Sequence, residues 1–173
     1  MKKVTMLVLL ACVTLTGFGL ARAGEEYGAP YKGSKEFERI KELVGVWEGT
    51  SNKEGEKVTV KYELTSGGSA ILEELFPGTP HGMISVYYDE GGKLFMTHYC
   101  MLRNRPHMEL KNADNNGIDF VLTTGSDINT EKDTHMHALQ IVFVDKDHIT
   151  QEWTMFENGK EKQVAVFKLS RVR

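Results

Sequence analysis

The stretch THYCMLRNRPHM, residues 97–108, places two histidines, a thiol and two thioethers within a short segment. Imidazole, thiolate and thioether groups are ligands that zinc and copper accept. A thiolate beside an oriented imidazole can also act as a nucleophile. The same side chains also occur in apolar cores, where a free cysteine behaves as a small hydrophobic residue. Their chemistry therefore depends on which way the surrounding strands point them.

Alternation predicts that two strands carry these groups on apolar faces. One face of the strand expected over residues 94–102 holds Leu94, Met96, His98, Cys100 and Leu102, and the other holds Phe95, Thr97, Tyr99 and Met101. In HMHALQIVF, His135 and His137 share a face with Leu139, Ile141 and Phe143. If both faces point inward, His98, Cys100, His135 and His137 line one interior, the first two about 7 Å apart along the strand.

Three readings of these groups stay open. The first is a zinc, copper or haem site built on His98, Cys100 and His137, with Met96 or Met101 as a soft ligand, although no CxxC or HExxH motif accompanies it. In the second, the histidines are buried and hydrogen-bonded and Cys100 is a core residue. In the third, these side chains contact an organic ligand. A Cys–His catalytic pair is disfavoured because side chains two apart on one strand run parallel. A hydrolase or isomerase remains a third hypothesis for the protein without a motif of its own, so binding is favoured over enzymatic activity.

Further candidate ligand contacts lie in the predicted turns and walls. His81 lies in FPGTPHGM and Arg103 in RNRPH, each expected at a barrel mouth or as a solvated turn residue. An arginine there could hold a carboxylate. Tyr62 and Tyr99 are expected to line the wall.

One of the adjacent carboxylates Glu73 and Glu74 must share the side of its apolar neighbours in AILEELF. A carboxylate inside a barrel has to be paired or protonated. We expect its partner to be Arg171 or an inward-facing histidine.

The first 23 residues have the pattern of a cleavable signal peptide, with Lys2 and Lys3 before an apolar run and ARA at its end. This predicts a periplasmic or secreted protein. A lipoprotein anchor at Cys12, in LLAC, is the disfavoured alternative. Residues 24–33 are expected to form a flexible lead-in, and residues 34–173 a single domain.

Charge and cysteine content limit the partners. The predicted signal peptide contains three of the 21 basic residues and no acid, which leaves 18 against 24 acidic residues and a formal charge near −6. Nucleic acid and anionic membrane surfaces are therefore unexpected partners. Cys100 is the one cysteine after residue 23, so stability must come from a core and not from an internal disulfide.

The predicted fold class is all-β, an antiparallel up-and-down barrel with one short N-terminal helix. In SKEFERIKELVGVW, Phe37, Ile40, Leu43 and Val44 lie three or four residues apart, with Ser34 as the N-cap of the helix. After this helix the hydrophobic period changes to two, and about ten strands follow, joined mostly by tight turns. They include GVWEGTS at residues 45–51, MISVYYDE at residues 83–90 and IDFVLTTGSDI at residues 118–128. Such a meander avoids exposed edges by closing into a barrel.

Two features resemble the calycin barrels, the lipocalin and fatty-acid-binding group. Gly45-x-Trp47 follows the helix and Arg171 lies in the last strand, as in the calycin closure where a basic side chain stacks across a tryptophan. Over most of residues 37–171, TSGGSAILEELFPGTPHGMISVYY, THYC and DHITQEWT resemble exported bacterial calycin-like proteins of unassigned function, distantly similar to nitrobindin-type haem barrels. No haem ligand can be matched to the nitrobindin pattern. The resemblance implies a barrel that binds something inside it, and no reaction.

The function expected from the sequence is non-catalytic binding of a small apolar or amphipathic ligand inside the barrel. Contacts with His98, His137 and Arg103 would fix the orientation of the ligand. The alternative is the metal- or haem-binding barrel that uses His98, Cys100 and His137. The ligand and the oligomeric state are not predicted.

Overall fold

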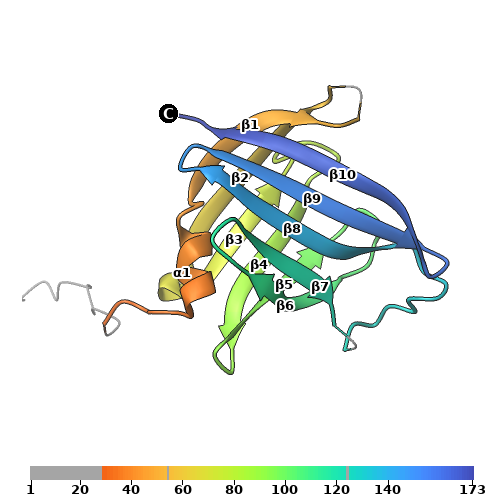
Figure 1. The fold of residues 1–173 in the computed structure, drawn as a ribbon, viewed down its shortest axis with the longest axis horizontal. Coiled ribbons are helices and arrows are strands. Elements are labelled where there is room, and N and C mark those ends of the chain that lie inside the picture. Colours follow the sequence, from red (N-terminus) through yellow and green to blue (C-terminus); the bar gives the residue numbers. More distant parts are fainter. Residues whose placement is uncertain (1–28, 54, 124) are drawn as a thin grey trace, which may run out of the picture.

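The computed structural model describes residues 29–53, 55–123 and 125–173 as a closed antiparallel barrel with one short α-helix (Figure 1). This confirms the predicted fold class. The predicted signal peptide, with Cys12, and half of the predicted lead-in lie outside the described residues.

Ten strands follow the helix α1 (Lys35–Lys41). They are β1 (Gly45–Ser51), β2 (Lys57–Thr65), β3 (Ala70–Leu75), β4 (Met83–Glu90), β5 (Lys93–Tyr99), β6 (His107–Ala113), β7 (Gly117–Leu122), β8 (His135–Asp145), β9 (His148–Glu157) and β10 (Lys160–Arg171), with a 3₁₀ turn at Ser66–Gly68. Each strand pairs with its neighbours along the chain, and β1 also pairs with β10, which closes the ring. Closure leaves no free sheet edge among these strands.

The helix α1 closes one end of the barrel. The Ser34 hydroxyl accepts a hydrogen bond from the backbone N–H of Phe37 and so caps the helix, as predicted. The same hydroxyl donates to Asp89 on β4 over 2.8 Å, which ties the start of the helix to the barrel wall. Phe37 and Ile40 of α1 are fully buried, and Leu43 just after the helix is 1 % exposed.

The two ends of the barrel differ in their connections. On the side of α1, short turns join β4 to β5, β6 to β7 and β8 to β9. At the opposite end, which we call the mouth, the longer connections 76–82, 100–106 and 123–134 join β3 to β4, β5 to β6 and β7 to β8. Figure 1 shows α1 at the left end and the connection from β7 to β8 at the right.

Side chains fill the barrel between these ends. Tyr87, Met96, Met108 and Ile141 face inward and have no exposed surface. A side chain without exposed surface leaves no water-sized void beside it, so the barrel is packed at the level of these residues. Space for a ligand must therefore be sought nearer the mouth.

Two strands end before the sequence predicts. The strand β5 stops at Tyr99, and the chain turns at Cys100, where the N–H of Arg103 donates to the Cys100 carbonyl over 2.9 Å. Arg103 takes a positive φ of 63° to complete this turn. Cys100 and Leu102 are therefore turn residues and do not continue the strand. The strand β7 stops at Leu122, and the polar segment 125–134 belongs to the connection that follows.

A β-bulge at His137 interrupts the alternation of β8. Met136 pairs with Met155 and Ala138 pairs with Thr154, which leaves His137 as the extra residue. Leu139 and Ile141 point into the barrel, but the residues before the bulge change sides. The prediction that His135 and His137 share the inward face of Leu139 is therefore wrong.

Candidate functional site

A cluster of polar side chains lies inside the barrel, which we call the interior polar cluster. Its members project from β2, β3, β4, β5 and β9: Tyr62, Glu73, Ser85, Tyr87, His98, Gln151 and Trp153. None of them is more than 2 % exposed. Because buried polar groups are costly unless they are hydrogen-bonded, their contacts decide what the cluster can do.

Glu73 is the centre of the interior polar cluster. The Tyr87 hydroxyl donates to Oε2 of Glu73 over 2.9 Å, and the side-chain amide of Gln151 donates to Oε1 over 2.6 Å. The same amide donates to the Tyr62 hydroxyl over 2.5 Å. The Gln151 carbonyl accepts from the indole N–H of Trp153 over 3.1 Å. Neither Arg171 nor a histidine pairs with Glu73, so that prediction is wrong.

Burial raises the pKa of Glu73, and hydrogen bonds from Ser85, Tyr62, Gln151 and Tyr87 partly offset this effect by stabilising the charged form. Burial also raises the pKa values of the Tyr62 and Tyr87 hydroxyls well above their ordinary range, and the negative charge of Glu73 adds to the shift. Both tyrosines therefore stay protonated and act as donors.

His98 lies on the mouth side of this cluster and is 1 % exposed. Its Nδ1 is 3.0 Å from the Ser85 hydroxyl, and its ring centroid is 4.6 Å from the Trp153 ring. Burial lowers its pKa to about 4, so the imidazole is neutral near pH 7.

The second ring nitrogen of His98, Nε2, has no hydrogen-bond partner among the residues that the structure describes. It is also absent from the set of wholly buried polar atoms without a partner, which among these residues consists of Asn104 Oδ1 and Thr123 Oγ1. His98 as a whole retains 1 % exposure. Asn104 and Thr123 both lie in connections at the mouth, where polar atoms without protein partners collect.

Half-buried apolar side chains line the mouth beyond His98. Phe76, Met83, Met136 and Ala165 pack against the core without being fully buried. Phe76 takes a positive φ of 53°, which is uncommon for a bulky residue, and its ring packs edge-on against Phe167 at 5.8 Å between centroids. Methionine side chains adapt easily to different shapes, so this rim suits an apolar guest.

The three residues of the predicted metal site do not come together. His98 points into the barrel, Cys100 lies in the turn after β5, and His137 is the bulge residue on the outer side of β8. Among the described residues, no group of three or more His, Cys, Asp and Glu side chains is arranged to hold a metal ion. Burial raises the pKa of the Cys100 thiol, and hydrogen bonds from the backbone N–H groups of Leu102 and Met101 partly offset this increase. This does not favour a reactive thiolate.

His135 and His137 form a pair of their own at the outer side of β8. His135 Nε2 is 3.2 Å from His137 Nδ1, and the His137 ring stacks on Phe156 at 4.0 Å. Burial lowers the pKa of His137, with smaller contributions from His135 and Lys111. A shallow surface groove of about 430 Å³ runs past His137 and Phe156.

The other predicted ligand contacts lie on the surface or in the core. Tyr99 is exposed on the outer face of β5, and Arg103 and His81 are exposed in two mouth connections. Met96 is inside the barrel opposite Met108, and Tyr62 belongs to the interior polar cluster. Of the predicted ligand contacts, Tyr62, Met96 and His98 therefore face the interior.

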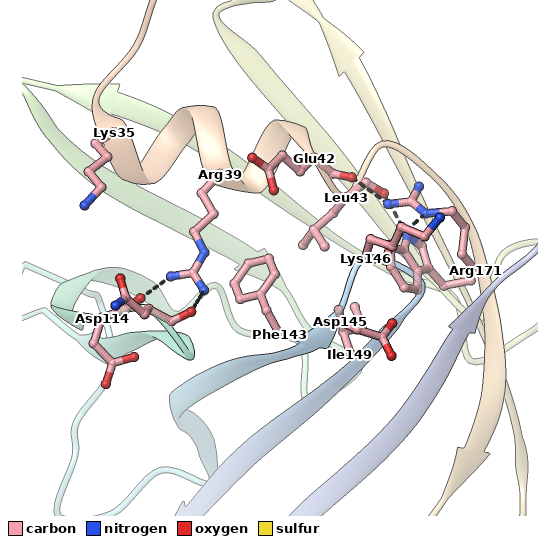
Figure 2. A pocket seen from close by; sticks show the side chains of 12 residues that line it. Lys35, Arg39, Glu42, Leu43, Asp114, Phe143, Asp145, Lys146, Ile149 and Arg171 are labelled. Carbon is pink, nitrogen blue, oxygen red and sulfur yellow. Dashed lines mark hydrogen bonds between the residues drawn. The ribbon is translucent and has the colours of Figure 1, made fainter.

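The closed end carries a cleft of about 400 Å³ beside α1, shown in Figure 2. The Arg171 guanidinium lies over the Trp47 ring at 4.2 Å and donates to the carbonyls of Glu42 and Val44. Arg39 lies over Phe143 at 4.0 Å and donates to the carbonyls of Asp114 and Asn115. Because backbone carbonyls occupy both guanidinium groups, these arginines fasten α1 to the barrel and are not available to an anionic ligand.

Sequence reasoning did not single out Ser85, Tyr87 or Gln151 as members of a site. A signal for Gln151 was present, because it alternates with Ile149 and Trp153 and so places an amide on an apolar face. Its contact with Glu73 joins residues 78 positions apart, and alternation within single strands cannot predict it.

Within the described residues, no helix combines the length and apolar character needed to cross a membrane. The barrel is consistent with the calycin architecture. A scan against protein-family models finds no match, and a search of curated proteins finds no significant relative.

Proposed function

We propose that this protein is a non-catalytic binding barrel that holds a small apolar or amphipathic molecule at the mouth, over His98 and Trp153. The observation that carries the proposal is Nε2 of His98. It is the polar atom of a nearly buried ring that lacks a protein partner among the described residues. The His98 ring contacts Ser85 and Trp153 and lies next to an apolar rim. A polar group among apolar side chains is typical of a ligand site.

Because the barrel centre is packed, we place the ligand at the mouth. Tyr87 and Met96 leave no free space at their level, whereas Phe76, Met83 and Met136 are only half-buried. The ligand would enter between these side chains and reach His98. A catalytic role is disfavoured, because the one hydroxyl beside a base, that of Ser85 at 3.0 Å from Nδ1 of His98, is fully buried where packing leaves no room for a substrate.

The distribution of methionines allows a direct test. Met83 and Met136 line the mouth, Met108 lies in the packed interior, and Met101 is exposed outside. In protein labelled with ¹³C at the methionine methyl groups, we expect N-phenyl-1-naphthylamine, an uncharged and mostly apolar probe, to shift the Met83 and Met136 resonances and to leave Met101 unchanged. Assignments come from single Met→Leu variants.

Two results would contradict the proposal. One is saturation of the probe without any change at Met83 and Met136. The other is a response confined to the aromatic ring resonances of Phe156 and His137, followed in the same titration, which would place binding in the outer groove.

A further inference from the structure

The hydrogen-bond direction around His98 defines the chemistry that its free nitrogen presents. Ser85 lies directly opposite Glu73 in the pairing of β3 with β4, and directly opposite His98 in the pairing of β4 with β5. Its hydroxyl therefore stands between a carboxyl group and an imidazole. A serine hydroxyl has one proton to donate and two lone pairs that accept.

An ionised Glu73 carboxyl can only accept hydrogen bonds, and it lies opposite Ser85 in the pairing of β3 with β4, so we assign the Ser85 proton to it. Hydrogen bonding from Ser85 stabilises the charged form of the Glu73 carboxyl and is the largest effect that opposes its burial. When Ser85 donates to Glu73, its oxygen is left to accept from His98, whose Nδ1 is 3.0 Å away. In a neutral imidazole, a proton on Nδ1 leaves Nε2 with a lone pair. The free nitrogen of His98 is then an acceptor.

The buried charges around the site also disfavour an anionic ligand. Among the buried residues that the structure describes, Glu73 is the one acidic side chain, and no buried lysine or arginine accompanies it. Arg171 and Arg39 are at the other end of the barrel, on backbone carbonyls. A carboxylate beside the lone pair of Nε2 would have no buried cation to neutralise it, because Arg103 and Arg105 in the mouth connection 100–106 are exposed to solvent.

We infer that the ligand is a neutral, flat molecule that donates a hydrogen bond from an O–H or N–H group to Nε2 of His98. This inference rests on the proposed function and names the ligand class for the same site. The Trp153 ring beside His98 and the Phe76 ring at the rim provide aromatic surfaces for such a molecule. Fatty acids and other carboxylates are disfavoured ligands.

Three naphthalenes with one ring system and different substituents separate the possibilities. They are 2-naphthol, which donates, 2-methoxynaphthalene, which cannot donate, and 2-naphthoate, which is an anion. Dissociation constants are measured near pH 7 from the methyl shifts of Met83 in the labelled protein. We expect 2-naphthol to bind about tenfold more tightly than its methyl ether, since one hydrogen bond distinguishes them. 2-Naphthoate should bind most weakly.

The outcomes distinguish this inference from the proposed function. If all three compounds bind at Met83 but the ether equals the naphthol, or the naphthoate is tightest, the inference is overturned and the binding barrel stands. If none of them shifts the resonances of Met83 or His98, both the proposed function and the inference are contradicted.

The tautomer of His98 provides a test that needs no ligand. In ¹⁵N-labelled protein near pH 7, the two ring nitrogens of His98 have separate resonances that report which one carries the proton. A proton on Nδ1 is the expected result, and a proton on Nε2 overturns the inference. The variant Ser85→Ala removes the acceptor at Nδ1. If it remains folded, the preference for 2-naphthol over the ether should shrink by at least about threefold, although the His98 ring remains.

Discussion

Gln151 on β9 and Glu73 on β3 meet across the barrel, with 2.6 Å between the amide nitrogen and Oε1 of the carboxyl group. The two strands are not neighbours in the sheet, because β10, β1 and β2 lie between them in the ring. This hydrogen bond therefore spans the interior and does not follow the wall. It connects opposite sides of the barrel at the level where packing leaves no free space.

Removal of the Glu73 side chain should destabilise the protein strongly. In Glu73→Ala, the amide of Gln151 and the hydroxyl of Tyr87 both lose their acceptor inside a closed barrel. Unpaired buried donors and the cavity together should lower the free energy of unfolding by about 3 kcal/mol. Urea denaturation measures this. The isosteric Glu73→Gln is the matched control and should lose much less near neutral pH.

The same pair of proteins tests the protonation of Glu73. Since burial raises the pKa of the carboxyl in the folded state above its unfolded value, the folded state holds the proton more tightly. The contribution of Glu73 to stability is fully present below the unfolded pKa and is lost as the pH rises through the folded pKa. The free energy of unfolding of the parent, relative to Glu73→Gln, should therefore fall as the pH rises above about 4.3, the ordinary pKa of a glutamate. A difference that rises with pH would show that the carboxyl is preferentially ionised in the folded protein.

The pH dependence of His98 has the opposite sign. Its folded pKa of about 4 lies below the ordinary value of 6.5, so the folded protein favours the neutral ring. Relative to His98→Phe, the parent should lose stability as the pH falls from the unfolded pKa towards the folded one. The total loss is at most about 3 kcal/mol. The titration of the His98 ring protons by NMR provides an independent value, and an ordinary pKa there would contradict this prediction.

The sequence predicts the strands of this fold well because the hydrophobic period is two and tight turns separate the runs. The predicted strand at residues 83–90 coincides with β4, and the one at residues 45–51 with β1. The positions of Trp47 and Arg171 in the first and last strands follow in the same way. Antiparallel closure then places these two residues opposite each other in the register.

The candidate site was predictable only in part, for two physical reasons. A bulge is a local insertion that leaves the alternating pattern intact on either side, so HMHALQIVF does not reveal that His137 is unpaired. The turn at Cys100 depends on a positive φ at Arg103, and an arginine does not predict this conformation. By contrast, His98 lies before the end of β5, and its inward direction follows from alternation alone.

Arg171 should stabilise the closed end through both its charge and its shape. It lies over Trp47 and donates to the carbonyls of Glu42 and Val44 at the end of the helix segment. We expect Arg171→Ala to lower the free energy of unfolding by about 2 kcal/mol. Arg171→Lys keeps the charge but cannot form the same pair of hydrogen bonds, so its loss should be intermediate. In a Trp153→Phe background, the fluorescence of Trp47 reports whether its surroundings change. Equal stability of the alanine variant and the parent would contradict the role assigned to this contact.

Phe76 provides the sharpest test of the mouth because its backbone and its side chain have opposite effects. The positive φ of 53° is costly for phenylalanine but not for glycine, while the ring covers Phe167. Phe76→Ala and Phe76→Gly both remove the ring, but only the glycine variant removes the strain. We therefore expect Phe76→Gly to be more stable than Phe76→Ala by about 1 kcal/mol in urea denaturation.

Both Phe76 variants should also open the path to His98. If the Phe76 ring restricts entry, its removal should accelerate exchange of 2-naphthol at the Met83 methyl group to the same extent in the alanine and glycine variants, whatever their difference in stability. A change that follows stability would instead indicate general loosening of the barrel. Exchange rates equal to those of the parent would mean that the ligand enters past another part of the mouth, such as the turn at Cys100.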